Sequence, residues 1–344
     1  MTALQATTPL SVAVAGEALV DFMSQANGSY LPCLGGAPFN VSRALARQGL
    51  GVLYLNPFSA DVMGRALALQ IQSDGVQLAQ PHPIVQNTSL AMVSLNAQGH
   101  PSYSFYREGV ADRHISATGL NAFCDLHPSL RVTCTGGLAL DPRDAGLYVP
   151  WLQAQKKAGR WVVIDANLRP SVMPDMALYR NHVLSVLNMA DLIKVSDEDL
   201  VHLGWDHCAP ELAARELLKQ TQASMLALTL GPEGAWLFTP HGACYAKELS
   251  TLSVIDTVGA GDSFLAGLIA SMHHEGHMRQ LLGNGPVPSD APPLNVTLPK
   301  VLRHALASAS LCVQEQGCVP PLWSEVVAWS AMHDVLTSDT SSIS

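Results

Sequence analysis

Residues 256–270, DTVGAGDSFLAGLIA, place two glycines around an alanine, follow them at once with an acid, and then run into an apolar segment. Apolar residues recur in that segment at the spacing of one helical face: Phe264, Leu265, Leu268, Ile269 and Met272. The glycines therefore lie at a helix N-terminus. Unpaired backbone N–H groups and the positive end of the helix dipole attract anions there.

Asp262 falls in the first turn of this helix, beside the place where an anion would bind. The amides of Gly259, Ala260 and Gly261 can stabilise charge on a phosphoryl group in transfer, while the carboxylate orients and deprotonates an attacking alcohol. The stretch thus fits a phosphotransfer site. Taken alone, a short glycine motif of this kind is more often an ordinary turn followed by a first-turn acid.

Composition narrows the class of protein. With 344 residues, 48% of them hydrophobic, the chain admits one large α/β domain or two smaller ones. A net charge of −9 without a run of Lys or Arg argues against nucleic acid as a partner. The sequence has no signal-peptide pattern and no apolar run of about 18 residues, so we expect no membrane partner. Seven cysteines without a CxxC pair indicate thiols in a reducing compartment, the cytoplasm.

Short buried strands alternate with helical segments along the chain. The strands are expected at 11–16, 51–55, 161–165, 191–195 and 225–230. Between them, segments 39–49, 61–75, 148–159 and 210–221 have the period of crossover helices. This alternation predicts a doubly wound, mostly parallel sheet flanked by helices, with ligands at the carboxyl ends of its strands.

Two regions break the alternation and predict a small β-sheet lid. Residues 17–35 and 88–109 look like strand pairs, the second turning at AQGH, 97–100. Residues 283–299, rich in Pro and Gly, are interpreted as a surface insertion. We expect a single domain over 11–338, with flexible tails at 1–10 and 339–344.

The sequence resembles the ribokinase-type sugar kinases of the phosphofructokinase-B family. DTVGAGDSFLAG is similar to one signature of that family, and GGAPFNVSRALARQG at 35–49 is similar to its N-terminal signature. The resemblance continues through GEALVDF (16–22), DANLRP (165–170), KVSDED (194–199) and LTLGPEGAWLF (228–238). It implies a ribokinase-like fold and an ATP-dependent carbohydrate kinase with Asp262 as general base.

The resemblance also assigns the sugar side of the site. Asp21 and Asn40 fall where relatives hold sugar hydroxyls, and Gly35 and Gly36 precede the helix that begins near Asn40. Arg169, just past a strand end, is placed where a cation meets phosphate or substrate. By itself, Asn40 could simply cap its helix.

The nucleotide side follows in the same way. The resemblance implies nucleotide contacts for Lys194, Ser196, Thr229, Gly231, Gly234, Thr257 and Ser308, the last beside the adenine. The family's N-x-x-E pattern, which organises Mg²⁺ and phosphate, falls on 196–199 and ends in Asp199 instead of Glu. A contact through water could absorb the missing methylene, since Mg²⁺ keeps several waters. Asp256 matches a position that in some relatives adjoins a monovalent cation such as K⁺.

The substrate stays open between two sugars. LPCLGGAPFN and the Ala111-Asp112 pair resemble bacterial fructokinases, which makes fructose the first choice. Tyr106-Arg107 matches the YYR of 2-keto-3-deoxygluconate kinases, where the arginine suits a substrate carboxylate. The alternative outside the enzymes is a catalytically silent regulatory module that binds a sugar or a nucleotide. We also expect a homodimer through exposed lid strands.

Overall fold

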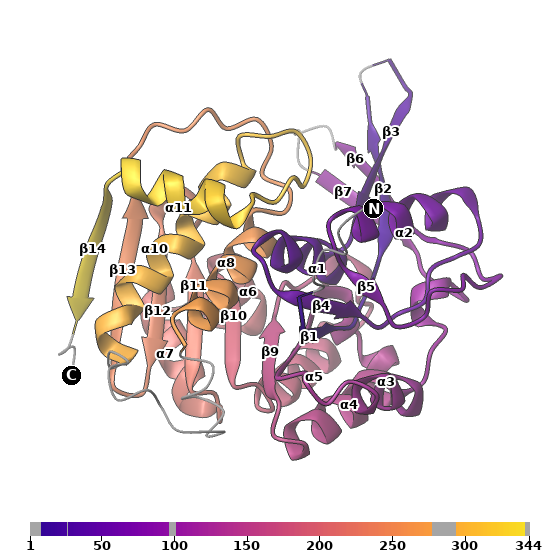
Figure 1. Ribbon diagram of the computed structural model, residues 1–344, viewed down its shortest axis with the longest axis horizontal. Helices are drawn as coiled ribbons and strands as arrows, with labels where there is room; N and C mark the ends of the chain where they lie inside the picture. Colours follow the sequence, from indigo (N-terminus) through magenta and orange to yellow (C-terminus); the bar gives the residue numbers. More distant parts are fainter. Residues whose placement is uncertain (1–7, 26, 96–100, 277–293, 341–344) are drawn as a thin grey trace, which may run out of the picture.

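A ten-stranded sheet forms the centre of the protein in the computed structural model, which describes residues 8–25, 27–95, 101–276 and 294–340 (Figure 1). Its strands run in the order β14-β13-β12-β11-β10-β9-β8-β1-β4-β5. Their bounds are β1 Leu10–Val14, β4 Gly51–Tyr54, β5 Gln77–Leu78, β8 Val132–Gly136, β9 Trp161–Asp165, β10 Leu192–Ser196, β11 Met225–Thr229, β12 Ala235–Thr239, β13 Gly242–Glu248 and β14 Val335–Thr340.

The strands from β5 to β11 pair in parallel, and β12, β13 and β14 extend the sheet in antiparallel fashion. All five strands that the sequence predicts are present. Parallel strands covered on both faces read as continuous apolar runs, and β9 and β11 do so. The mostly parallel, doubly wound sheet is therefore confirmed, and the carboxyl ends of β1, β8, β9, β10 and β11 meet at one edge.

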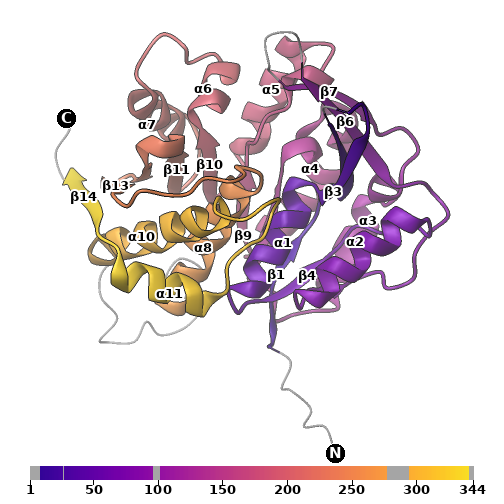
Figure 2. The same cartoon turned by 90° about the horizontal axis from the view of Figure 1, so that it is seen from above.

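Helices cover both faces of the sheet (Figure 2). One layer consists of α1 Ala37–Arg47, α2 Val62–Ser73, α8 Ala260–His274, α10 Leu294–Cys312 and α11 Trp323–Met332. The other consists of α3 Ala117–Asp125, α4 Ala145–Lys157, α5 Met176–Leu187, α6 Asp197–Leu203 and α7 Pro210–Gln220. The predicted crossover helices correspond to α1, α2, α4 and α7. Helix α8 packs most closely on α10 and α1, so its start is set by two neighbours from distant parts of the chain.

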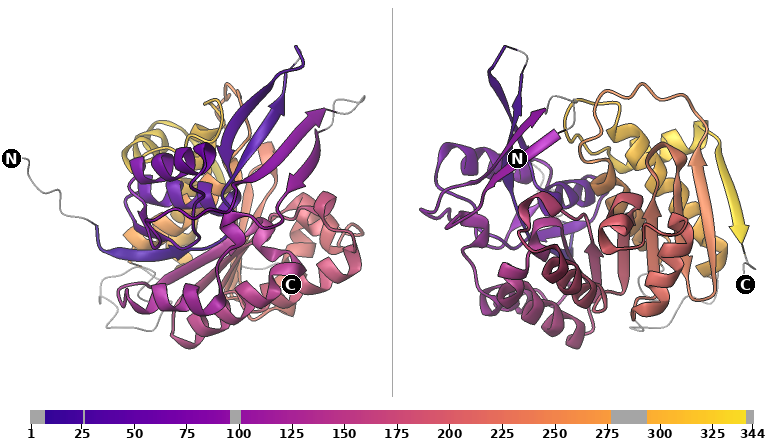
Figure 3. Two further views of the ribbon diagram at one scale, coloured as in Figure 1. Left: turned by 90° about the vertical axis from the view of Figure 1, so that its right-hand side faces the viewer. Right: turned by 180° about the vertical axis from the view of Figure 1, so that it is seen from behind.

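The expected lid is a separate four-stranded sheet of β2 Leu19–Ser24, β3 Tyr30–Gly35, β6 Ser89–Leu95 and β7 Pro101–Tyr106. Its order is β3-β2-β6-β7, with β2 and β6 parallel. It projects from the body of the protein beyond the carboxyl edge of the main sheet (Figure 3). A small apolar cluster of Leu19, Ala91 and Leu138 joins the lid to the body. The AQGH turn lies outside the described residues.

Three expected boundaries need correction. Leu10 belongs to β1 and is buried, because β1 pairs with β4 from its first residue. Residues 339 and 340 are the end of β14, paired with Cys244 and Ala243, and not part of a flexible tail. Residues 294–299 begin α10 despite Pro299, because the apolar face that starts at Leu298 is buried in the core. The rest of the expected insertion lies outside the described residues.

Candidate active site

Helix α8 begins where the glycines predict it. Gly259 precedes the helix with φ 78°, and a Cβ there would lie 2.2 Å from Cys318 Sγ, so only glycine fits. No side chain caps this helix, which leaves first-turn N–H groups facing outward from its start. The amide of Ala260 donates a long hydrogen bond, 3.3 Å, to the Thr257 carbonyl. Because the Ala260 amide is already engaged, binding of an anion depends most on the amides of the residues after Ala260.

Asp262 is buried in this first turn, only 7% exposed. Its Oδ2 accepts a hydrogen bond of 2.9 Å from Asn40 Nδ2, which reaches across from α1. Burial raises the pKa of Asp262 to about 6, although the Asn40 amide and the cations Lys194 and Arg169 oppose the rise. Such an acid is ionised at neutral pH and is a far stronger base than an exposed carboxylate.

A buried ion pair stands beside the helix start. Lys194 Nζ lies 3.0 Å from Asp165 Oδ1, joining neighbouring strands β10 and β9. The same Nζ is 3.0 Å from the point where a Cβ on Gly261 would lie. Burial would lower the pKa of Lys194, but the carboxylates of Asp165, Asp199 and Asp262 outweigh it and raise that pKa. A fixed positive charge therefore lies next to the anion-attracting turn.

Ser196 and Asp199 form a capping box at the start of α6. Asp199 Oδ2 accepts from the Ser196 amide at 2.8 Å, and Oδ1 accepts from the Leu168 amide at 2.7 Å. Asp199 thus ties α6 to the 165–170 loop, where Asn167 adopts a φ of 37°. A carboxylate has about four lone-pair sites, so two bonds leave room for a water in the shell of Mg²⁺. The remaining lone pairs of Asp199 therefore fit the expected contact with Mg²⁺ through a water.

The predicted sugar side comes together under the lid. Gly35 leaves room for Asp21, whose Oδ2 would lie 3.0 Å from a Cβ there, and Gly36 has a φ of 109°. Burial raises the pKa of Asp21 to about 6, and Arg169 partly opposes it. Arg169 Nη1 donates to the carbonyls of Asn167 and Leu168, which holds its side chain along the loop.

The predicted nucleotide residues lie at the end of β11 and in the turn that follows. Thr229 Oγ1 donates to the Val195 carbonyl at 3.5 Å. Gly231 and Gly234 have φ values of 55° and 93°, and a Cβ on Gly234 would lie 2.3 Å from the Ala246 carbonyl. These glycines therefore form a turn that other residues could not adopt without strain.

Near the GAG turn, Thr257 is exposed, whereas Asp256 is engaged with backbone. Asp256 accepts from the amides of Val258 at 3.0 Å and Gly317 at 2.9 Å. The carboxylate thus fastens the 313–321 segment to the turn before α8.

Ser308, which the resemblance places beside the adenine, lies on a packed face of α10. Its side chain is fully buried between helices, where Oγ donates to the His304 carbonyl at 3.0 Å and accepts from Gln48 at 3.4 Å. A Cβ on Gly267 would lie 2.4 Å from that hydroxyl. The helical period places Ser308 in α10 but does not say which face meets α8, and Ser308 belongs to the packed face.

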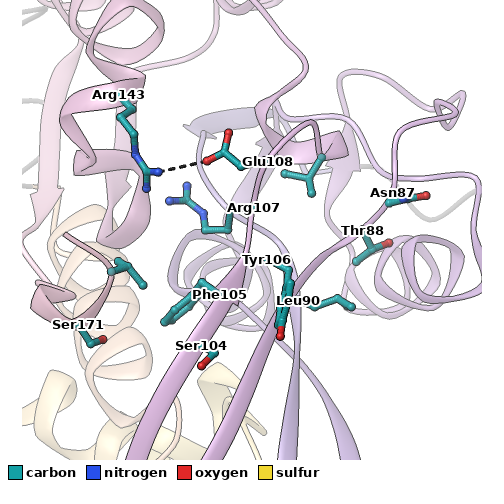
Figure 4. A pocket seen from close by; sticks show the side chains of 12 residues that line it. Asn87, Thr88, Leu90, Ser104, Phe105, Tyr106, Arg107, Glu108, Arg143 and Ser171 are labelled. Carbon is teal, nitrogen blue, oxygen red and sulfur yellow. Dashed lines mark hydrogen bonds and ion pairs between the residues drawn. The ribbon is translucent and has the colours of Figure 1, made fainter. Parts of the chain in front are cut away.

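Arg107 is likewise buried, at 5% exposure, at the base of the lid. Its Nη1 lies 3.2 Å from Asp141 and its Nη2 3.4 Å from Asp144. Tyr106 is 60% exposed. Figure 4 shows both beside a cavity of about 610 Å³ at the edge of β7, where Glu108 meets Arg143 at 3.1 Å. Neighbouring carboxylates therefore neutralise the arginine that was expected to bind substrate.

The 313–321 segment completes the site from the far end of the chain. Arg43 Nη1 donates to the Cys318 carbonyl at 3.0 Å and Gln48 Nε2 to the Pro321 carbonyl at 3.3 Å, so α1 is tied to this segment. Cys318 in turn packs on Gly259. Residues 313–321 therefore form a strap that holds both α1, which carries Asn40, and α8, which carries Asp262.

Several buried acids around the candidate site were not singled out from the sequence. Asp165 carries a signal that could have found it, since an acid that ends a buried strand needs a partner. Glu17, Asp141 and Asp144 have no such local signal, because their partners are distant in sequence.

A buried acid beside an uncapped helix N-terminus suits the transfer of a phosphoryl group to an alcohol. Residues 14–325 match the pfkB family carbohydrate kinases, and the chain belongs to that family. It has the ribokinase-like fold of these enzymes and is an ATP-dependent sugar kinase.

The curated relatives include fructokinases. That of Rhizobium leguminosarum bv. trifolii is 30% identical over 286 residues, covering 79% of this chain and 86% of the relative. That of Escherichia coli is 29% identical over 275 residues, covering 76% and 84%. Among solved structures, the fructokinase of Xylella fastidiosa with bound ATP superposes with a TM-score of 0.77 at 24% identity, covering 92% of this chain and 97% of that one.

A second solved structure is the fructokinase of Vibrio cholerae O395 with fructose, ADP and a calcium ion. It has a TM-score of 0.73 at 22% identity and covers 93% of this chain and 99% of that one. In the part of the chain that the structure describes, no helix combines the length and apolar character needed to cross a membrane.

Proposed function

We propose that this kinase is a fructokinase, which transfers the γ-phosphoryl group of MgATP to a hydroxyl of fructose. The observation that carries the proposal is the buried contact between Asn40 and Asp262 at the start of α8, 2.9 Å long. It sets a carboxylate of raised pKa directly beside an uncapped helix N-terminus. The fructokinase names of the relatives support the choice of sugar.

Asp262 acts as the general base. The fructose hydroxyl oxygen bonds to the γ-phosphorus, the bond from that phosphorus to the β–γ bridging oxygen breaks, and the hydroxyl proton passes to Asp262. Lys194 and the first-turn amides of α8 stabilise charge on the transferring group. Asn40 Oδ1 is buried without a partner in the described residues, so it is a free acceptor for a sugar hydroxyl.

Two carboxylates of this site, those of Asp199 and Asp256, are the candidate groups for metal ions. Asp199 would hold a water of Mg²⁺, and the ion would neutralise charge on the ATP phosphates. For a monovalent cation the carboxylate of Asp256 is the candidate ligand. Both roles are part of the proposal, supported by the donor sets described above.

Arg107 favours the neutral sugar over a keto-acid. A substrate carboxylate needs a guanidinium edge with two free donors. Here Nη1 and Nη2 already face Asp141 and Asp144, and Nε, which has no partner in the described residues, is buried. Binding 2-keto-3-deoxygluconate through Arg107 would require the guanidinium to leave its buried contacts with Asp141 and Asp144.

Two further features belong to the proposal. The outer edges of β3 and β7 have no partner strand within the described chain, which supports a homodimer through the lid, detectable by light scattering.

The seven cysteines are free thiols, which supports a reducing compartment such as the cytoplasm.

The experiment that tests the proposal is a coupled ADP-release assay with MgATP and a panel of fructose, 2-keto-3-deoxygluconate, ribose, tagatose and a nucleoside. We expect kcat/KM to be highest for fructose. Preference for the keto-acid would overturn the choice of sugar and the interpretation of Arg107. Bound ATP without turnover of any acceptor would favour a silent binding module.

The pH dependence follows from two carboxylates. Burial raises the pKa of both Asp262 and Asp21 to about 6, and both act as hydrogen-bond acceptors in their ionised forms. We therefore expect kcat/KM to be flat above about pH 7 and to fall below about pH 6 with a slope that approaches two protons. In Asp21→Asn the slope should drop to one. A profile that stays flat down to pH 4.5 would contradict the assignment of Asp262.

A further inference from the structure

Glu17 is a buried acid between β1 and β2, only 4% exposed. The chain enters it through Gly16, where a Cβ would lie 2.3 Å from Pro38 Cγ. The segment that carries Glu17 is therefore pressed against the first turn of α1. Behind it, the Glu17 carbonyl lies 2.6 Å from the point where a Cβ on Gly36 would be.

The Glu17 carboxylate joins two backbone segments. Its Oε1 accepts from the Ala37 amide and from the Leu138 amide, each at 3.3 Å. Ala37 is the first residue of α1, and Leu138 lies in a short helix, Gly137–Leu140, that follows β8. A Cβ on Gly137 would lie 2.7 Å from the same oxygen, so the glycine admits the acid.

This contact does the work of a helix cap. Gly36 stands at the capping position of α1 and has no side chain to offer, and α1 has no acid in its first turn. A carboxylate brought in from another segment satisfies the first amide and interacts favourably with the positive end of the helix. Glu17 therefore fixes the start of α1 to the end of β8.

The first turn of α1 also contains the residue that touches the reacting acid. Asn40 lies three residues after Ala37, and its Nδ2 donates to Asp262 at 2.9 Å. Glu17 Oε2 is buried with no hydrogen-bond partner among the described residues. Burying a carboxylate that is only partly paired costs free energy, so an ordinary packing role would be filled better by an apolar side chain.

We propose that Glu17 is a positioning residue for phosphoryl transfer, which holds the start of α1 so that Asn40 keeps its contact with Asp262. The inference rests on the proposed role of Asp262 as the base. Displacing a reacting group by about 1 Å can cost on the order of 100-fold in rate, so a cap that sets this position has a measurable effect on kcat.

The test is a double-mutant cycle with MgATP and the best sugar of the panel. Glu17→Ala should lower kcat by about 10- to 100-fold while the KM for MgATP stays within about twofold, since the nucleotide side is untouched. Glu17→Gln, which keeps an acceptor oxygen, should restore most of the rate. In an Asn40→Ala background, Glu17→Ala should cause little further loss, because the contact it protects is already gone.

The matched control is Glu325→Ala, which removes an acid that accepts from the Leu322 amide at the start of α11. It should leave kcat unchanged. If Glu17→Ala fails to fold by circular dichroism, Glu17→Asp replaces it in the cycle, since its shorter side chain cannot reach both amides. Losses that multiply independently in the cycle, or a Gln variant as slow as the Ala variant, would overturn the inference.

The proposed role of Asp262 as the base and the positioning role of Glu17 are overturned by different results. An Asp262→Asn enzyme with the wild-type rate would overturn the proposed base and with it the premise for Glu17. An inert Asp262→Asn enzyme together with independent effects of Glu17 and Asn40 would overturn the positioning role alone.

Discussion

Asp262→Asn is expected to lower kcat by about 10³-fold, within the range of about 10²- to 10⁴-fold that a general base contributes. The substituted amide can still accept the hydrogen bond from Asn40, so the geometry of the site survives, but it cannot take the hydroxyl proton. ATP binding should persist, because Lys194 and the first turn of α8 are unchanged. Coupled ADP release and nucleotide titration measure the two effects separately.

The same variant should be more stable than the wild type at pH 8. Burial raises the pKa of Asp262 to about 6, above its value in the unfolded chain, so the wild type loses stability as pH rises through about 6. Removing the charge recovers roughly 1 to 3 kcal/mol. Thermal unfolding at pH 8 checks this.

Glu211→Gln is the matched control for Asp262→Asn, because Glu211 is a first-turn acid of α7 on the opposite layer. Its rate should stay within about twofold of the wild type. A near-wild-type rate for Asp262→Asn would contradict the assignment of the base.

Lys194→Met is expected to destabilise the fold by about 3 to 5 kcal/mol, because it leaves Asp165 buried without its cation. Burial already raises the pKa of Asp165 to about 7 with Lys194 present, and without this cation the pKa rises further, so the loss should deepen as pH rises from 6 to 8. Urea unfolding at both pH values measures the change.

The double variant Lys194→Met, Asp165→Asn separates stability from catalysis. It should recover most of the lost stability, because no unpaired charge stays buried. Turnover should stay low, since the ammonium group beside Gly261 is still missing. A single Lys194→Met variant as stable as the wild type would contradict the structural half of this prediction, and a fully active double variant the catalytic half.

The sequence predicted those helices and strands whose residue pattern lies within one short segment. The glycines before α8 and the apolar face after them are sufficient to place the helix start and its first-turn acid. Short runs of apolar residues predicted the buried strands β9 and β11 in the same way. By contrast, β8 reads VTCTG, whose threonines hide a fully buried strand, and it was missed.

The rest of the site depends on contacts between distant segments. Arg107 resembles a substrate anchor in sequence, but its partners lie 34 and 37 residues further along the chain, and they alone show that its charge is already met. The helical period likewise placed Ser308 in α10 but could not reveal that its hydroxyl is packed against Gln48 and Gly267. Glu17 acts on α1 from outside the helix, so no capping pattern in the α1 sequence announces it.

The strap at 313–321 has a consequence for the order of events during synthesis. The lid and the start of α1 leave the ribosome early, whereas Cys318, which packs on Gly259 and accepts from Arg43, is among the last residues of the fold to be translated. A single domain generally folds as a unit, and these contacts cannot form until residues 313–321 have left the ribosome. Ribosome-bound chains that end before Cys318 therefore lack the contacts that hold α1 and α8 together.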